Sequence, residues 1–242
     1  ARVYIEVTAE CNLACQTCVR NTWSEPIGSM KTDVFNSLIE QLQEFKNLQS
    51  VMFGGFGEPT CHKDILEMIG QVKSLGVQAE MTTNGTLLDK DMLIGLMKNK
   101  LDTLWVSFDG TSEESFDSIR AGASFKELVK NLKLLKEMNK VSTHKIKVGI
   151  VFVVMKKNIE QLINLRKLAR EVGAVMALVS NVIPYSYDMV EQMLCTLSVE
   201  KNSQSADART FSINLPSIDI FALSKQPLFE LLRGDYNISI MN

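Results

Sequence analysis

The feature that most constrains this chain is the alternation of short apolar segments with helical patterns over residues 1–183. Parallel strands need a crossover connection that is usually a helix, so this alternation predicts a parallel α/β sheet. Six successive units favour a partial (β/α)6 TIM-like barrel with a short C-terminal extension, and a doubly wound sheet is the competing architecture. The Val- and Ile-rich segments expected as strands are 2–8, 50–53, 77–82, 104–108, 145–154 and 174–180.

Capping signals mark the helices between these segments. Thr32 or Asp33 is expected to begin the first helix, because short polar residues favour that position. A single helix is expected at 158–171. The spacing of a capping box occurs twice after the fourth strand, at Thr111 with Glu114 and at Ser124 with Glu127.

The pattern changes after Pro184. We therefore divide the chain into a core barrel, residues 1–183, and a C-terminal extension, residues 184–242. The segments expected in the extension are a polar loop at 200–209, a strand at 211–220 and a helix at 227–232. The chain opens on Ala and ends abruptly at Asn242, which is consistent with a truncated extension.

Charge and hydropathy exclude several functions. Lys and Arg total 26 and Asp and Glu total 28, whereas domains that bind nucleic acid are usually basic, so no nucleic-acid partner is expected. The longest apolar run, residues 148–155, is far shorter than the roughly 20 residues of a membrane span. With no signal peptide either, we expect a cytoplasmic protein without a membrane partner. There, clustered cysteines bind metal more often than they form disulfides, while Cys61 and Cys195 are expected as small buried hydrophobic residues.

Three cysteines, Cys11, Cys15 and Cys18, lie in one short loop directly after the first expected strand. Their spacing allows one loop to bind a compact metal centre with three thiolates. Structural zinc sites and four-iron clusters usually have four protein ligands, so three thiolates leave one coordination position open. Three interpretations stand at this point: an iron–sulfur cluster with an exchangeable iron, a zinc site completed by a distant histidine, and three core cysteines.

Polar and glycine-rich motifs follow the next three strands. Glycines permit a close backbone approach to a ligand, and the neighbouring carboxylates, hydroxyl and amide suit an amino acid or a ribose. The carboxyl ends of parallel strands form the active-site face of β/α barrels, so these motifs are expected to meet. They are Gly54, Gly55, Gly57 and Glu58 after the second strand, Thr83 and Asn84 after the third, and Ser107 and Asp109 after the fourth.

With these motifs in place, the chain resembles the radical SAM superfamily. The resemblance rests on the CxxxCxxC loop and on the stretches GGFGEP, TNG and SFDG, and it covers residues 2 to about 183. It implies a partial six-stranded β/α barrel, a four-iron–four-sulfur cluster and S-adenosylmethionine. Cys11, Cys15 and Cys18 would ligate the cluster, whose fourth iron would bind the amino and carboxylate groups of S-adenosylmethionine.

The resemblance also assigns residues to S-adenosylmethionine itself. The backbone of the glycines and Glu58 would hold the methionine amino group, Ser107 and Asp109 the ribose or the carboxylate, Arg120 the carboxylate, and Thr83 and Asn84 would make further contacts. Asn181 would reach the adenine region. Family members place an aromatic residue before the third cysteine, where this chain has Thr17. We therefore expect Phe56, or a side chain of the fifth strand, to cover the adenine.

The implied activity is reductive cleavage of S-adenosylmethionine to a 5′-deoxyadenosyl radical that abstracts a substrate hydrogen, with a reductant such as ferredoxin or flavodoxin. The stretches GGFGEPTCHKDI and SNVIPYS are most similar to a branch of metalloenzyme maturases and peptide-modifying enzymes. The expected substrate is therefore a peptide, a protein or a cofactor precursor. That branch often carries a cysteine-rich SPASM extension, whereas Cys195 is the only cysteine in residues 184–242. The alternatives are a non-catalytic metal-binding β/α module and an inactive scaffold.

Overall fold

The fold is a curled parallel sheet with helices on its outer side. A computed structural model describes residues 1–194, 196–201, 209–214 and 237–241. The strands are β1 (Arg2–Ile5), β2 (Ser50–Phe53), β3 (Gln78–Thr83), β4 (Thr103–Ser107), β5 (Lys147–Val154), β6 (Met176–Asn181), β7 (Thr196–Lys201), β8 (Arg209–Asn214) and β9 (Asn237–Met241). Seven of them form one sheet in the order β1-β2-β3-β4-β5-β6-β9, and all of its neighbours pair in parallel.

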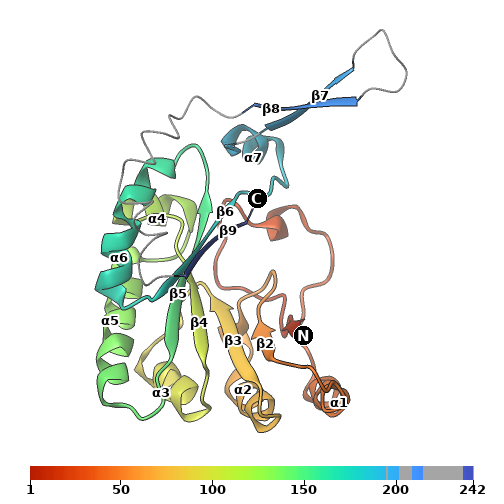
Figure 1. Cartoon of the computed structure of the whole chain (residues 1–242), viewed down its shortest axis with the longest axis vertical. Coiled ribbons are helices and arrows are strands. Elements are labelled where there is room, and N and C mark those ends of the chain that lie inside the picture. Colours follow the sequence, from red (N-terminus) through yellow and green to blue (C-terminus); the bar gives the residue numbers. More distant parts are fainter. Residues whose placement is uncertain (195, 202–208, 215–236, 242) are drawn as a thin grey trace.

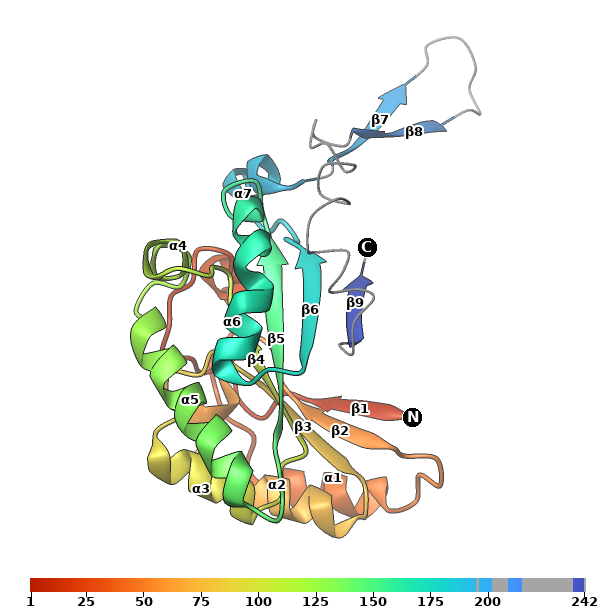
Figure 2. The same cartoon turned by 60° about the vertical axis from the view of Figure 1, so that its left-hand side comes forward.

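Helices connect the successive strands and follow the outside of the curve, with α1, α2, α3, α5 and α6 along it (Figure 1, Figure 2). They are α1 (Thr32–Leu42), α2 (Ile65–Ser74), α3 (Lys90–Lys98), α4 (Glu113–Ile119), α5 (Phe125–Val141), α6 (Leu165–Val172) and α7 (Tyr187–Gln192). Short 3₁₀ turns lie at Val19–Thr22, Pro59–Cys61 and Ile159–Asn164. This architecture confirms the predicted partial (β/α)6 barrel over the doubly wound sheet, since the sheet order follows the chain order from β1 to β6.

The core lies between the sheet and these helices. α1 buries Phe35, Ile39 and Leu42, which recur at helical spacing, and Phe35 packs on Phe53 of β2 with ring centroids 6.2 Å apart. Apolar side chains of the other strands and helices continue this layer. The helices cover the outer face of the sheet, so a site is expected in the loops at the carboxyl ends of the strands. No helix in the described part of the chain is long and apolar enough to span a membrane.

Several expected element boundaries need correction. β1 ends at Ile5 rather than at residue 8, because Thr8 leaves the sheet and bridges antiparallel to Ser29. Lys31, not Thr32 or Asp33, occupies the position before α1. The expected helix at 158–171 is a 3₁₀ turn followed by α6.

One of the two predicted capping boxes is placed correctly. Ser124 caps the start of α5, and its hydroxyl accepts the N–H of Glu127 at 3.4 Å. The other is wrong by one residue: Ser112 caps α4, while the Thr111 hydroxyl bonds to the Gln161 side chain at 2.8 Å.

The C-terminal extension holds two features that the sequence patterns did not predict. β7 and β8 form an antiparallel hairpin, so the ends of the expected 200–209 loop are strand instead. β9 returns to the large sheet and pairs in parallel with β6 (Figure 2). The expected strand at 211–220 is confirmed only for 211–214, within β8. Its remainder, the expected helix at 227–232 and Cys195 lie outside the described residues.

Candidate functional site

A cavity of about 190 Å³ lies where β2, β3 and β4 end, and it collects residues from separate loops. All the predicted site residues line it except Gly54 and Asp109, and Asn181 is exposed at the end of β6. The motifs that are far apart in the sequence therefore meet in one place. The lining residues are Cys11, Cys15, Thr17, Cys18, Gly55, Phe56, Gly57, Glu58, Thr82, Thr83, Asn84, Ser107 and Arg120.

The cysteine loop follows β1 and crosses to the end of α4 and the turn that follows it. Two backbone hydrogen bonds hold it there, from Ala14 N to Ala121 O (3.2 Å) and from Gln16 N to Ile119 O (3.0 Å). Burial raises the pKa of the Cys15 thiol; Asp109 and the thiols of Cys11 and Cys18 act in the same direction, whereas the Arg120 cation opposes them. The three thiols are thus close enough to influence one another electrostatically.

The arrangement of the thiols bears on the kind of metal that they suit. Among the described residues, no three His, Cys, Asp or Glu side chains converge closely enough to hold a single metal ion. A zinc ion needs all its sulfur ligands within about 2.3 Å. The three thiols nevertheless line one cavity, from a single loop.

The glycine-rich turn after β2 packs tightly against the chain that leaves β1. The Gly54 N–H donates to the Ile5 carbonyl (3.1 Å), and the Glu58 N–H donates to the Glu10 carbonyl (2.7 Å). A side-chain carbon at Gly57 would lie 1.9 Å from the Thr8 carbonyl oxygen. Only glycine permits this approach, which brings the turn beside the cysteine loop.

Glu58 is almost fully buried and connects the turn after β2 to the loop after β3. Its Oε1 accepts the Thr60 N–H (3.0 Å), the Thr60 hydroxyl (2.6 Å) and the Thr83 hydroxyl (2.7 Å), while Oε2 accepts the Asn84 N–H (2.6 Å). These bonds satisfy Oε1 and leave acceptor capacity on Oε2. Glu58 therefore organises the loops and keeps one oxygen available to the cavity.

Asn84 connects the third loop to the cysteine loop. Its side-chain amide donates to Asn12 Oδ1 (3.0 Å) and lies 3.8 Å from the Cys11 sulfur. The Leu13 N–H also donates to that sulfur, at 3.4 Å. Hydrogen bonds to sulfur tune a metal centre and orient its ligands. The residues around Cys11 are thus arranged to support a thiolate ligand.

Asp109 and Arg120 form a buried ion pair behind the cavity. Arg120 Nη2 lies 2.8 Å from Asp109 Oδ2, with side-chain exposures of 12% and 1%. Asp109 Oδ1 accepts the Val153 N–H (3.0 Å), so both oxygens are engaged. Arg120 Nε is buried and has no hydrogen-bond partner within the described residues, although the side chain lines the cavity. The Arg120 side chain therefore joins the buried ion pair to the wall of the cavity.

Five residues in or beside the cavity have roles that no sequence motif assigns, or that a motif assigns only loosely. Thr82 and Thr17 line the cavity. Phe56 lines it too, and its ring meets Trp23 edge-on with centroids 5.3 Å apart. Lys157 donates to the Gln16 side chain at 2.5 Å, and burial lowers its pKa, an effect that Asp109 opposes. Trp23 and Lys157 lie in no motif, so only tertiary structure could locate them.

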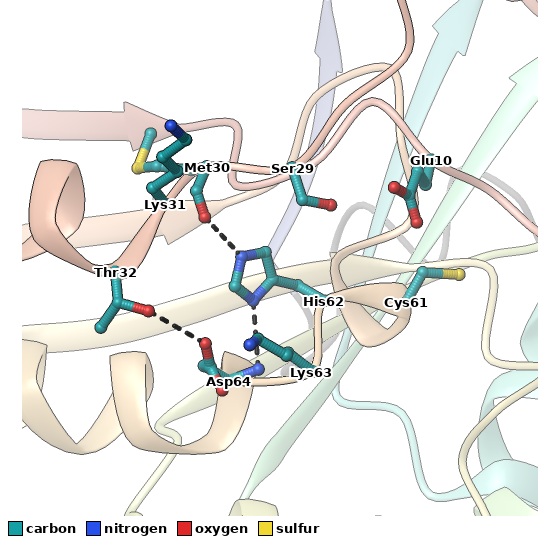
Figure 3. A pocket seen from close by; sticks show the side chains of 9 residues that line it. All are labelled: Glu10, Ser29, Met30, Lys31, Thr32, Cys61, His62, Lys63 and Asp64. Carbon is teal, nitrogen blue, oxygen red and sulfur yellow. Dashed lines mark hydrogen bonds between the residues drawn. The ribbon is translucent and has the colours of Figure 1, made fainter.

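A second cavity, of about 500 Å³, lies between the starts of α1 and α2 (Figure 3). Its central side chain, His62, is buried and fully engaged: Nε2 lies 2.9 Å from the Met30 carbonyl, and Nδ1 accepts the Asp64 N–H at 3.1 Å. Cys61 is only half-buried on its wall, so the expectation of a buried hydrophobic cysteine is wrong here. The histidine thus orders the turn before α2.

The chain belongs to the radical SAM superfamily, since the model of that superfamily matches residues 5–169, more than half of the chain. This family consists of enzymes that use S-adenosylmethionine and an iron–sulfur cluster. The match begins in β1 and ends in α6, so it includes every loop of the first cavity.

Curated relatives are named for modifying cofactors or peptides. The tungsten-containing aldehyde ferredoxin oxidoreductase cofactor-modifying protein of Pyrococcus furiosus is 32% identical over 202 residues, which are 82% of this chain and 56% of the relative. The PqqA peptide cyclase of Granulibacter bethesdensis is 30% identical over 190 residues, 77% of this chain and 48% of the relative. The chain thus spans about half the length of the curated relatives that it matches.

Solved structures show the same fold. Streptococcus suis SuiB bound to S-adenosylmethionine superposes with a TM-score of 0.71 at 19% identity, covering 100% of this chain and 50% of that one. At this identity the similarity concerns the fold alone.

Proposed function

We propose that this chain is the catalytic barrel of a radical SAM enzyme that cleaves S-adenosylmethionine reductively at a four-iron–four-sulfur cluster bound by Cys11, Cys15 and Cys18. One observation carries the proposal: the three thiols, the glycine-rich turn and the Arg120 side chain line a single cavity. Thiolates suit an iron–sulfur cluster, and a cluster with three protein ligands keeps one iron open for a small molecule.

The residues present fit both groups. When bound, the reduced cluster supplies one electron that breaks a carbon–sulfur bond of S-adenosylmethionine and yields a radical able to abstract hydrogen. The protein binds the cluster and S-adenosylmethionine, orients them toward each other and excludes water. The Arg120 guanidinium binds the methionine carboxylate, and the buried Asp109 positions that guanidinium rather than touching the ligand.

Other residues at the cavity bind the ammonium, ribose and adenine groups of S-adenosylmethionine. The backbone of the Gly54–Gly57 turn and the remaining capacity of Glu58 Oε2 hold the methionine ammonium. The Ser107 hydroxyl, which has no hydrogen bond among the described residues, binds the ribose. Phe56, supported by Trp23, covers the adenine in place of the aromatic residue that Thr17 replaces.

The substrate class follows from the relatives. Two of them are named for modifying a cofactor and a peptide, so the substrate is a peptide, a protein or a cofactor precursor. The electron that reduces the cluster comes from a reductant such as ferredoxin or flavodoxin. We assign the catalytic barrel to residues 1–183 and a C-terminal extension to residues 184–242, and we propose that the protein acts in the cytoplasm.

The test is anaerobic purification with iron and sulfide analysis, followed by reduction in the presence of S-adenosylmethionine. We expect about four irons and four sulfides per chain, and formation of 5′-deoxyadenosine and methionine. Cys15→Ala should lose the cluster, whereas Cys61→Ala, a matched cysteine outside the cavity, should retain it. Zinc without sulfide would support the non-catalytic module, and a cluster that never yields 5′-deoxyadenosine would support the inactive scaffold.

A further inference from the structure

Glu6 contacts the glycine-rich turn although it belongs to no motif of the site. It follows β1 directly, between the buried Ile5 and Val7, and its side chain points away from theirs because successive side chains alternate. Its Oε1 accepts two backbone N–H groups of the turn, from Phe56 at 2.7 Å and from Gly57 at 3.2 Å. A carboxylate that receives two adjacent amides makes charge-assisted bonds, which are stronger than neutral ones.

These two bonds complete a pattern in the turn. Four of the five N–H groups from Gly54 to Glu58 donate to the chain segment that leaves β1: Gly54 to the Ile5 carbonyl, Phe56 and Gly57 to the Glu6 carboxylate, and Glu58 to the Glu10 carbonyl. No hydrogen bond ends on the carbonyl groups of Gly54–Gly57 within the described part of the chain. The polar groups that the turn keeps for a ligand are therefore mainly acceptors, which suit an ammonium group.

Gly55 shows how closely the carboxylate and the turn are fitted. Its φ of +139° lies in a region that side chains rarely adopt, and a side-chain carbon added there would lie 2.6 Å from the Glu6 carboxyl carbon. The turn therefore needs both the absence of a side chain at Gly55 and an external partner for its amides. Glu6 supplies that partner.

We propose that Glu6 is a positioning residue for the methionine ammonium of S-adenosylmethionine: by binding the Phe56 and Gly57 amides, it holds the turn with its carbonyl acceptors available to the ligand. This inference rests on the proposed function, because it concerns the same cavity. Without Glu6, the two amides would be free donors beside a cation, and the turn would lose its ordered shape.

The experiment compares Glu6→Ala and Glu6→Gln in the cluster-loaded protein. Binding of S-adenosylmethionine is followed by the change in the electron paramagnetic resonance spectrum of the reduced cluster, and iron and sulfide are counted in each variant. Glu6→Ala should bind S-adenosylmethionine about tenfold more weakly with full cluster content, since it loses two bonds to an ionised acceptor. Glu6→Gln keeps an oxygen acceptor and should recover most of the affinity.

The control is Glu25→Ala, which removes an exposed acid of the same β1–α1 connection and should leave binding unchanged. Wild-type affinity in Glu6→Ala, equal losses in Ala and Gln, or loss of the cluster itself in Glu6→Ala would each overturn the inference while leaving the proposed function intact. If the wild-type cluster does not bind S-adenosylmethionine at all, the proposed function fails and the inference fails with it.

Discussion

The ion pair between Asp109 and Arg120 shows what single residues contribute at this site. Asp109 comes from the loop after β4 and is completely buried, and Arg120 ends α4. Taking two charges out of water is costly, and the cost is offset only when their geometry is good and the remaining polar atoms are satisfied. Here Asp109 Oδ1 also accepts the Val153 N–H at 3.0 Å, whereas Arg120 Nε has no hydrogen-bond partner among the described residues.

Replacing Asp109 by Asn should therefore destabilise the fold by about 3 kcal/mol, because it leaves the Arg120 charge buried and uncompensated. Urea unfolding of the protein measures this free energy. Glu137→Gln is the control, since its pair with Lys140 is exposed on both sides and should change stability by less than about 0.5 kcal/mol. Similar effects of the two substitutions would contradict a buried, coupled pair.

For single residues, the sequence predicts which residue types form the site better than it predicts their hydrogen-bond and ion-pair partners. The three cysteines, the glycines and Ser107 follow from motif spacing, because parallel βα units bring the carboxyl ends of their strands to one edge. The bonds of Asp109 to Arg120 and of Glu6 to the turn do not follow from spacing. They depend on side-chain rotamers and on segments about ten or fifty residues apart in the chain.

Among the elements, a polar network on the sheet connects strands that are distant in the sequence. Glu80 of β3 is buried, binds the Trp105 indole N–H of β4 at 3.0 Å and pairs with Arg2 of β1 at 2.9 Å. Trp105 in turn lies over Gly149 of β5, where an added side-chain carbon would be 2.4 Å from the ring. A glycine inside a strand usually weakens it, so here it marks a close approach by a neighbouring side chain.

Gly149→Ala should lower the free energy of unfolding by about 1–3 kcal/mol, because the methyl group overlaps the Trp105 ring and forces it off Glu80. Chemical unfolding monitored by tryptophan fluorescence measures both the stability and the ring environment. Gly28→Ala is the matched control, since nothing lies within 4 Å of the added carbon. Unchanged stability and fluorescence in Gly149→Ala would show that the ring moves away freely.

Element types were easier to predict than element ends, for a physical reason. Hydrophobic periodicity is a property of a whole segment, and it located all six strands from β1 to β6. Ends are decided by single hydrogen bonds, such as the contact that directs Thr8 from β1 toward Ser29. The sequence pattern does not reveal β9, because its short run, residues 237–241, joins the sheet across a long separation in sequence from its partner β6.

For the whole molecule, the sheet is a stable scaffold to which the cysteine loop is attached by separate hydrogen bonds. The strands are tied by continuous ladders and a common apolar core. The loop has two backbone bonds, from Ala14 and Gln16, to the end of α4 and the turn after it, and side-chain bonds to Asn84 and Lys157. Regions with few buried contacts open locally at low free energy. A metal cluster that binds Cys11, Cys15 and Cys18 would add three covalent attachments to this loop.

Removal of the cluster should therefore loosen the loop and leave the barrel folded. We expect backbone amides of residues 11–22 to exchange with solvent at least about tenfold faster in the apo protein than in the loaded protein, because binding free energy becomes local folding free energy. The amides of β2, β3 and β4 should exchange equally in both. Anaerobic hydrogen–deuterium exchange read by mass spectrometry resolves these segments, and Cys15→Ala should match the apo protein. Equal protection of the loop in both forms would mean that the protein alone orders it, and uniform loosening of the sheet would mean that the cluster stabilises the entire fold.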